Sequence, residues 1–176
     1  MGEHNISQGT DEKARRQFMK ALLTEVRALE DMHTAGMFEG GVRRIGAEQE
    51  MFLVDEAHRP SLTATQLLEN ISDSRFTHEL GLFNLEANLS PLELGGDCLR
   101  RLHGETDEVV QIAREHAARQ GAQVALVGIL PTLTKEHLSL EAMVPKPRYF
   151  ELNNALMNLR GRNFKFGIKG IDQLEL

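Results

Sequence analysis

Segment 82–90 alternates strictly between apolar and polar residues, and this alternation restricts the fold more than any other feature of the sequence. One face would carry the apolar residues and the other the polar ones: Phe83, Leu85, Ala87 and Leu89 against Asn84, Glu86, Asn88 and Ser90. Successive side chains of a strand point to opposite faces, so the segment is predicted to be a strand with one buried face. A parallel sheet covered by helices on both sides has continuous apolar runs instead, so the alternation argues against one.

Segment 45–54 has the same two-faced character. Apolar residues take its odd positions and two acids take even ones: Ile45, Ala47, Met51 and Leu53 against Glu48 and Glu50. The two acids are therefore predicted to share one face of a strand. With two strands of this kind, we expect an α+β fold with an antiparallel or mixed sheet and helices on one face.

Helical periodicity appears outside these strands. From Asp11, apolar residues recur every three or four positions as far as Leu29, which predicts an amphipathic helix that ends near Gly36. Pro145 and Pro147 are expected to prevent regular structure where they lie. The other elements expected are a turn at 55–60, a helix at 63–71, a turn at 73–74, a long helix at 98–119 interrupted near Gly104, a buried strand at 123–130, a helix at 149–159 and a strand at 163–169.

Length and charge limit the class of protein. The 176 residues fit one domain, with residues 1–10 as a disordered tail and residues 11–176 as the folded part. The 26 acids outnumber the 20 basic residues, which argues against a nucleic-acid partner. The longest apolar run, 124–130, is far below the roughly 20 residues that cross a bilayer. With a polar start and a lone Cys98, we expect a cytoplasmic protein without a membrane partner.

The acids of the two strands suggest a metal site. Glu48 and Glu50 would lie about 7 Å apart on one face, and Glu86 could add a third carboxylate from a paired strand. Mg²⁺ is typically held by a few carboxylates together with substrate phosphates, so the pattern suggests a metal-bound nucleotide. The alternative is an ordinary solvated sheet face, on which exposed glutamates at alternate positions are common.

Glu79 fits this pattern only with a change of register. It lies seven residues before Glu86, and an odd interval in one strand would place the two acids on opposite faces. A bulge or bend at Gly81 would bring Glu79 to the polar side. Alternatively, Glu79 lies at the start of the strand and faces water.

Three sequence elements together resemble the glutamate-cysteine ligase family, in its type 2 carboxylate-amine ligase branch. They are Gly-Ala-Glu-Gln-Glu at 46–50, the run from Glu79 to Pro91 with its Glu-x6-Glu-x-Asn-x-x-Pro pattern, and Pro-Arg-Tyr at 147–149. The first element alone is a weak signal, but the three in this order are fairly specific.

The resemblance implies an ATP-dependent ligase that joins a carboxylate, usually the γ-carboxylate of glutamate, to an amine such as that of cysteine, as in glutathione biosynthesis. It also implies a glutamine-synthetase-like antiparallel sheet whose glutamates hold Mg²⁺. By this likeness Glu48, Glu50, Glu79 and Glu86 would be the metal ligands. Arg148 would contact a substrate carboxylate or phosphate, unless it is only a surface arginine. Asn88 would orient substrate or a metal ligand, or else cap backbone.

Members of the family are longer, and their later strands carry a His-x-His-type element and further metal and nucleotide contacts that this sequence lacks. We therefore expect an N-terminal part of a single ligase catalytic domain, with small-molecule substrates. An unpaired sheet edge could favour a homo-oligomer or association with a missing part.

Other functions remain as alternatives. A non-catalytic interaction or regulatory module could keep the fold without the activity, and a different metal enzyme such as a hydrolase could use the same acids. A P-loop, a nucleophile elbow and a His-Glu-x-x-His helix are absent from the sequence. His78, the histidine next to a candidate acid, could have a functional role, but a structural one is the more reasonable.

Overall fold

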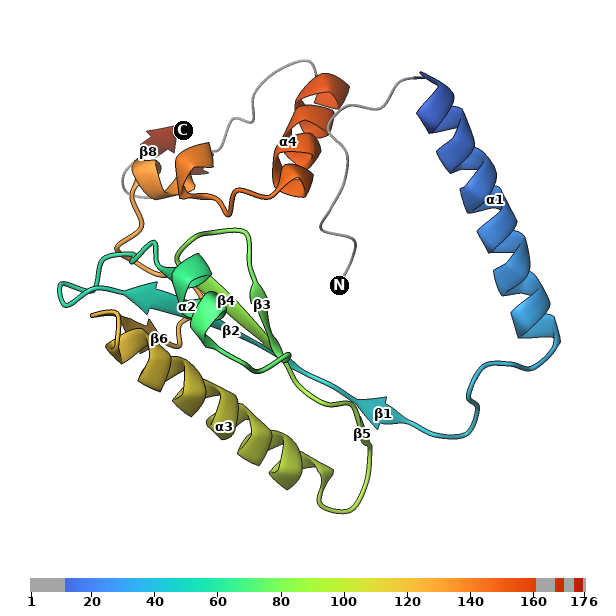
Figure 1. The fold of residues 1–176 in the computed structure, drawn as a ribbon, viewed down its shortest axis with the longest axis horizontal. Coiled ribbons are helices and arrows are strands. Elements are labelled where there is room, and N and C mark those ends of the chain that lie inside the picture. Colours follow the sequence, from blue (N-terminus) through green and yellow to red (C-terminus); the bar gives the residue numbers. More distant parts are fainter. Residues whose placement is uncertain (1–11, 161–166, 170–172, 176) are drawn as a thin grey trace. The chain divides into compact units, whose positions relative to one another are not determined.

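The computed structural model describes residues 12–160, 167–169 and 173–175 (Figure 1). The chain divides into two units, one formed by residues 11–144 and the other by residues 1–10 and 145–176. The predicted tail at residues 1–10 lies outside the described residues, and the single-domain assignment of residues 11–176 stays a prediction. Every helix in the described part of the chain is too short or too polar to cross a membrane.

The larger unit begins with a long helix and continues with short strands and helices (Figure 1). In chain order these are α1 (Glu12–Thr34), β1 (Arg44–Ile45), β2 (Glu48–Val54), α2 (Ala64–Asn70), β3 (Phe76–His78), β4 (Asn84–Asn88), β5 (Leu92–Glu93), α3 (Cys98–Ala118), β6 (Gln123–Ala125), and the 3₁₀ turns η1 (Lys135–Leu138) and η2 (Leu140–Ala142).

Four of these strands form one antiparallel sheet in the order β3-β4-β2-β6. In β2, Met51 and Leu53 are buried while Glu48 and Glu50 are exposed. In β4, Leu85 and Ala87 are buried, and the residues that alternate with them, Asn84, Glu86 and Asn88, are partly exposed. The predicted alternation of faces is therefore confirmed within β2 and β4. Phe83, expected on the apolar face, instead lies before β4 and stacks on Phe52.

The apolar face of the sheet packs against α2 and α3. Residues 0 % exposed come from all of these elements and form one cluster, among them Met51, Leu53, Leu67, Leu85, Val109 and Ala113. Burial of such apolar side chains drives folding, because each large aliphatic one stabilises the folded state by roughly 1.5–3 kcal/mol. The expected α+β class, with helices on one face of an antiparallel sheet, is confirmed for this unit.

Three predictions within this unit are wrong. The 98–119 helix has no interruption, because α3 continues through Gly104. The strand predicted at 123–130 ends at Ala125, and Leu126, Val127 and Ile129 beyond it are exposed. Strand 45–54 is divided at 46–47, so that β1 pairs with β5 in a separate two-stranded sheet.

The described part of the second unit contains α4 (Pro147–Arg160) and the antiparallel pair β7 (Gly167–Lys169) and β8 (Gln173–Glu175). The predicted helix at 149–159 is confirmed. It starts at Pro147, where regular structure was not expected, because the missing N–H of a proline has no cost in the first helical turn. Residues 163–166 of the predicted last strand lie outside the described residues.

Candidate functional site

The polar face of β2 and β4 brings three candidate acids together. In the antiparallel register Glu50 lies directly opposite Glu86, and Glu48 lies opposite Asn88. Side chains in directly opposite positions have Cβ atoms about 4.5–5.5 Å apart, so Glu50 and Glu86 are close neighbours. Glu48 is two residues along β2 on the same face. The shared face predicted for Glu48 and Glu50 is confirmed, and β4 adds Glu86 to it.

Asn88 contacts one of these acids. Its Nδ2 donates a hydrogen bond to Oε1 of Glu86 at 2.6 Å, between positions two apart on β4. A hydrogen bond to an ionised group is stronger than one between neutral groups and fixes the direction of the carboxylate. Of the roles left open for Asn88, the structure therefore supports the orientation of an acid.

Glu79 belongs to a different strand segment from Glu86. β3 and β4 are antiparallel, with Thr77 opposite Glu86, and the chain reverses between them. Glu79 lies just beyond the end of β3, so strand parity does not fix its face. The odd interval no longer argues against a shared face, because it contains the reversal of the chain, and the position of Glu79 beside Glu86 stays a prediction. The Glu79 carboxylate accepts a hydrogen bond from the N–H of Leu80 at 2.8 Å.

Gly81 makes this reversal compact. The N–H of Asn84 donates to the carbonyl of Gly81 at 3.0 Å. A Cβ atom on residue 81 would come within 2.8 Å of Asn84 Oδ1 and 3.1 Å of the Phe83 ring. The absence of a side chain at position 81 thus allows Phe83 and Asn84 to approach the backbone closely in this turn.

An aromatic pair borders the acidic face. Phe52 follows Glu50 on the same side of β2 and stacks on Phe83, with ring centroids 6.2 Å apart, while His137 meets Phe83 edge to face. The position of Phe52 was not singled out from the sequence. The signal was present nevertheless, because Phe52 has the same parity as Glu48 and Glu50.

A cluster of charged residues holds the edge of the site to α3. The guanidinium of Arg75 contacts Asp73 at 2.7 Å, Glu108 at 2.7 Å and Glu105 at 3.5 Å. Glu105 also accepts hydrogen bonds from the N–H and hydroxyl of Ser90. The hydrogen bond from Arg75 lowers the pKa of Asp73. This cluster joins both ends of the β3–β4 segment to the helix and was not foreseen from the sequence.

Arg148 lies in α4, in the other unit of the chain. Its guanidinium carbon is 5.5 Å from the centre of the Tyr149 ring. Burial and the charge of Arg148 lower the pKa of nearby Lys146. Arg148 and the glutamates belong to different units of the chain, and the contact of Arg148 with substrate stays a prediction.

The donor atoms fit a hard divalent cation. Within the described residues, no group of three or more His, Cys, Asp or Glu side chains is arranged to hold a metal ion by itself. Mg²⁺ commonly uses only one or two carboxylates, with waters and substrate phosphates completing its shell. Glu50 and Glu86, in opposite positions, offer carboxylates of the right type, and the roles of Glu48, Glu50, Glu79 and Glu86 as metal ligands stay a prediction.

Comparison with known proteins decides the family. The model of glutamate-cysteine ligase family 2 (GCS2) matches residues 44–174, which include every candidate site residue. The chain belongs to glutamate-cysteine ligase family 2. The resemblance drawn from the three sequence elements is thereby confirmed.

A relative of this glutamate-cysteine ligase family 2 chain comes from Paenarthrobacter aurescens (strain TC1) and is named "Putative glutamate--cysteine ligase 2-3". The two are 28% identical over 139 residues, which is 77% of this chain and 28% of the relative. The chain thus spans less than a third of the length of that relative. No solved structure matches the chain.

Proposed function

We propose that this chain supplies the acidic sheet of an ATP- and Mg²⁺-dependent ligase that joins the γ-carboxylate of glutamate to an amine such as that of cysteine. The observation that carries the proposal is the position of Glu50 directly opposite Glu86 on the exposed sheet face. Membership of glutamate-cysteine ligase family 2 supports the reaction class. In this proposal the chain is part of a glutamine-synthetase-like catalytic domain that acts in cytoplasmic glutathione biosynthesis.

The charges on this face favour a bound cation. Like charges in directly opposite positions of a sheet are destabilising, on a scale of roughly 0.2–1 kcal/mol per pair. A divalent cation held by Glu50 and Glu86 would remove that repulsion. Mg²⁺ would also neutralise the triphosphate and stabilise the charge that develops as the γ-phosphoryl group is transferred.

The proposed reaction needs no nucleophile from the protein. A substrate carboxylate oxygen attacks the γ-phosphorus of ATP, ADP leaves, and an acyl phosphate forms. The amine nitrogen then attacks the acyl carbon, phosphate leaves, and loss of a proton from nitrogen gives the amide. Glu48, Glu50, Glu79 and Glu86 would hold the metal while Asn88 orients Glu86. Arg148 would bind a carboxylate or phosphate with its two-pronged guanidinium.

Titration calorimetry of the full-length protein with ATP and Mg²⁺ tests the proposal. Glu50→Gln keeps the size of the side chain but removes its charge, so we expect at least about tenfold weaker binding of Mg-ATP and loss of ligation. Glu69→Gln is the matched control, because Glu69 is exposed on α2. Equal affinity and turnover in wild type and Glu50→Gln would reject the assigned role.

Two other outcomes would replace the proposed activity. Binding of Mg-ATP without ligation of any amine would favour a non-catalytic module that keeps the fold. Metal-dependent hydrolysis without ATP would favour a hydrolase that uses the same acids.

A further inference from the structure

Helix α1 carries a large exposed apolar surface that the proposed ligase function does not use. None of its 23 residues is buried. Seven large apolar side chains on it are between 37% and 66% exposed: Phe18, Met19, Leu22, Leu23, Val26, Leu29 and Met32. Contiguous apolar surface of this kind marks interaction sites. The helix lies before residue 44, where the family match begins, so this surface is separate from the matched region.

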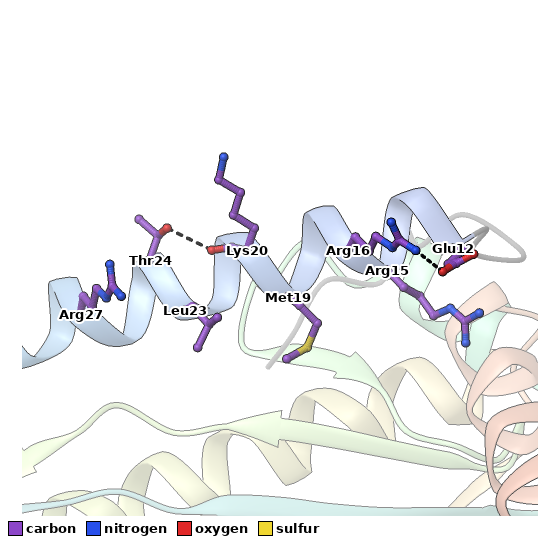
Figure 2. Close-up of a pocket in the computed structure, with 8 residues that line it drawn as sticks. All are labelled: Glu12, Arg15, Arg16, Met19, Lys20, Leu23, Thr24 and Arg27. Carbon is purple, nitrogen blue, oxygen red and sulfur yellow. Dashed lines mark hydrogen bonds and ion pairs between the residues drawn. The ribbon is translucent and has the colours of Figure 1, made fainter.

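The apolar residues have the spacing of a helix-pairing seam. Met19, Leu22, Val26 and Leu29 are separated by three, four and three residues, which is the a/d pattern of a two-stranded coiled coil. Figure 2 shows Met19 and Leu23 projecting from one side of α1, with Lys20 and Thr24 on the other. All the side chains drawn there belong to α1, so the pocket that they line is open helix surface rather than an enclosed cavity.

The charges of α1 divide between its two halves. Residues 12–20 contain four basic residues and one acid, a net charge of +3, and residues 25–33 contain one basic residue and three acids, a net charge of −2 with histidine neutral. This order opposes the helix dipole, whose positive end is at the N-terminus. A second helix lying antiparallel would place each half beside charge of the opposite sign and would also oppose the two dipoles.

We propose that α1 pairs antiparallel with α1 of a second copy of this chain. With the pseudo-twofold axis at residue 24, Met19 packs against Leu29 of the partner subunit, and Leu22 packs against Val26 of the partner subunit. In the same register Arg16 and Glu30 of the partner subunit occupy the e positions that flank the seam, so their side chains can pair across it. Arg16 also pairs with Glu12 within its own helix, so it bridges both acids.

Charge complementarity selects a second copy as the occupant. Each α1 carries a basic half and an acidic half, so an antiparallel pair brings a basic half beside an acidic half at both ends. A membrane surface would instead favour basic residues along the whole polar face, whereas the C-terminal half of α1 is acidic.

Sedimentation equilibrium of the full chain tests the pairing. Wild type is expected to have twice its monomer mass. Arg16→Glu reverses the charge facing Glu30 of the partner subunit and acts twice in a symmetric dimer, so the dissociation constant should rise at least about tenfold. Adding Glu30→Arg to that chain should restore the dimer. Arg100→Glu, on an exposed position of α3, is the matched control.

Several results would overturn the proposal. A monomeric wild type would do so, whether α1 then binds anionic vesicles or stays with its own chain. A dimer that withstands the Arg16 reversal would place the interface elsewhere, for example at a sheet edge. Failure of the compensating Glu30 reversal to restore the dimer, with helix content unchanged by circular dichroism, would reject the antiparallel orientation. None of these measurements depends on ligase activity.

Discussion

Arg75 shows how single residues support the site without belonging to it. Its side chain is 21% exposed and contacts Asp73, Glu105 and Glu108. The hydrogen bond from Arg75 lowers the pKa of Asp73 in the folded state. A depressed carboxyl pKa stabilises the fold above the unfolded value of about 3.9, and this contribution disappears as the pH falls through the lower folded value.

We expect Arg75→Met to reduce the free energy of unfolding by about 2 kcal/mol near neutral pH, because charge-assisted hydrogen bonds are lost. The penalty should shrink as the pH falls below about 4, because Asp73 is then protonated in the unfolded chain and, at still lower pH, in the folded state as well. Urea unfolding across this pH range measures both effects. Arg59→Met is the control, since the Arg59 side chain is 71% exposed and its surface pair with Asp55 should contribute little to stability. A penalty that is independent of pH would contradict this account.

At the residue scale, parity along a strand was sufficient to place Glu48, Glu50 and Glu86 on polar faces. It could not show that Glu50 lies opposite Glu86, because the register between two strands depends on the turn that joins them. The contacts of Arg75 cross up to 33 residues of sequence and depend on how α3 docks. No local pattern in the sequence reports such a contact.

Among the elements, α3 shows that tertiary packing can override the low helix propensity of a single residue. Gly104 lowers helix propensity by about 1 kcal/mol relative to alanine, and an interruption was expected there. The helix is continuous because Val109, Val110 and Ala113 pack against the sheet and hold it in place. At 126–130 the prediction was wrong in the other direction. The apolar composition predicted a buried strand, but most of this segment is exposed and lies outside β6.

Two glycine substitutions should therefore have opposite effects. Gly104→Ala is expected to raise the free energy of unfolding by about 0.5–1 kcal/mol, because a Cβ there meets nothing within 4 Å. Gly81→Ala should lower it by about 1–3 kcal/mol, since the added Cβ meets Asn84 and the buried Phe83 ring. Thermal and chemical unfolding of both variants measures the difference. Similar shifts in the same direction would show that the turn at Gly81 accommodates a side chain.

For the whole molecule, the antiparallel sheet and its helical cover followed from alternation and periodicity. The short strands β3 and β5 did not, because elements of two or three residues carry too little pattern. The division of the chain into two units was also not foreseen. It depends on contacts between distant segments rather than on a change in composition.

Deletion of residues 1–34 should leave the sheet and its core intact. α1 contributes no buried residue, so the free energy of unfolding of the remaining chain should change by no more than about 0.5 kcal/mol when wild type is measured as a monomer. The shortened chain should also stay monomeric at concentrations where wild type pairs. Denaturant unfolding and sedimentation measure these two properties. A large loss of stability would mean that α1 packs on its own chain.

Because β2 pairs with β4, the packing of the hydrophobic core also fixes the positions of the acids on the opposite face of the sheet. Sliding one strand by a single residue would put Leu85 opposite Glu50 and turn the whole apolar set toward water, at the cost of the core. The acids are thus aligned by residues that never touch a ligand. A protein engineer could exchange Glu50 or Glu86 for histidine to recruit a softer metal while leaving untouched every side chain that enforces the alignment.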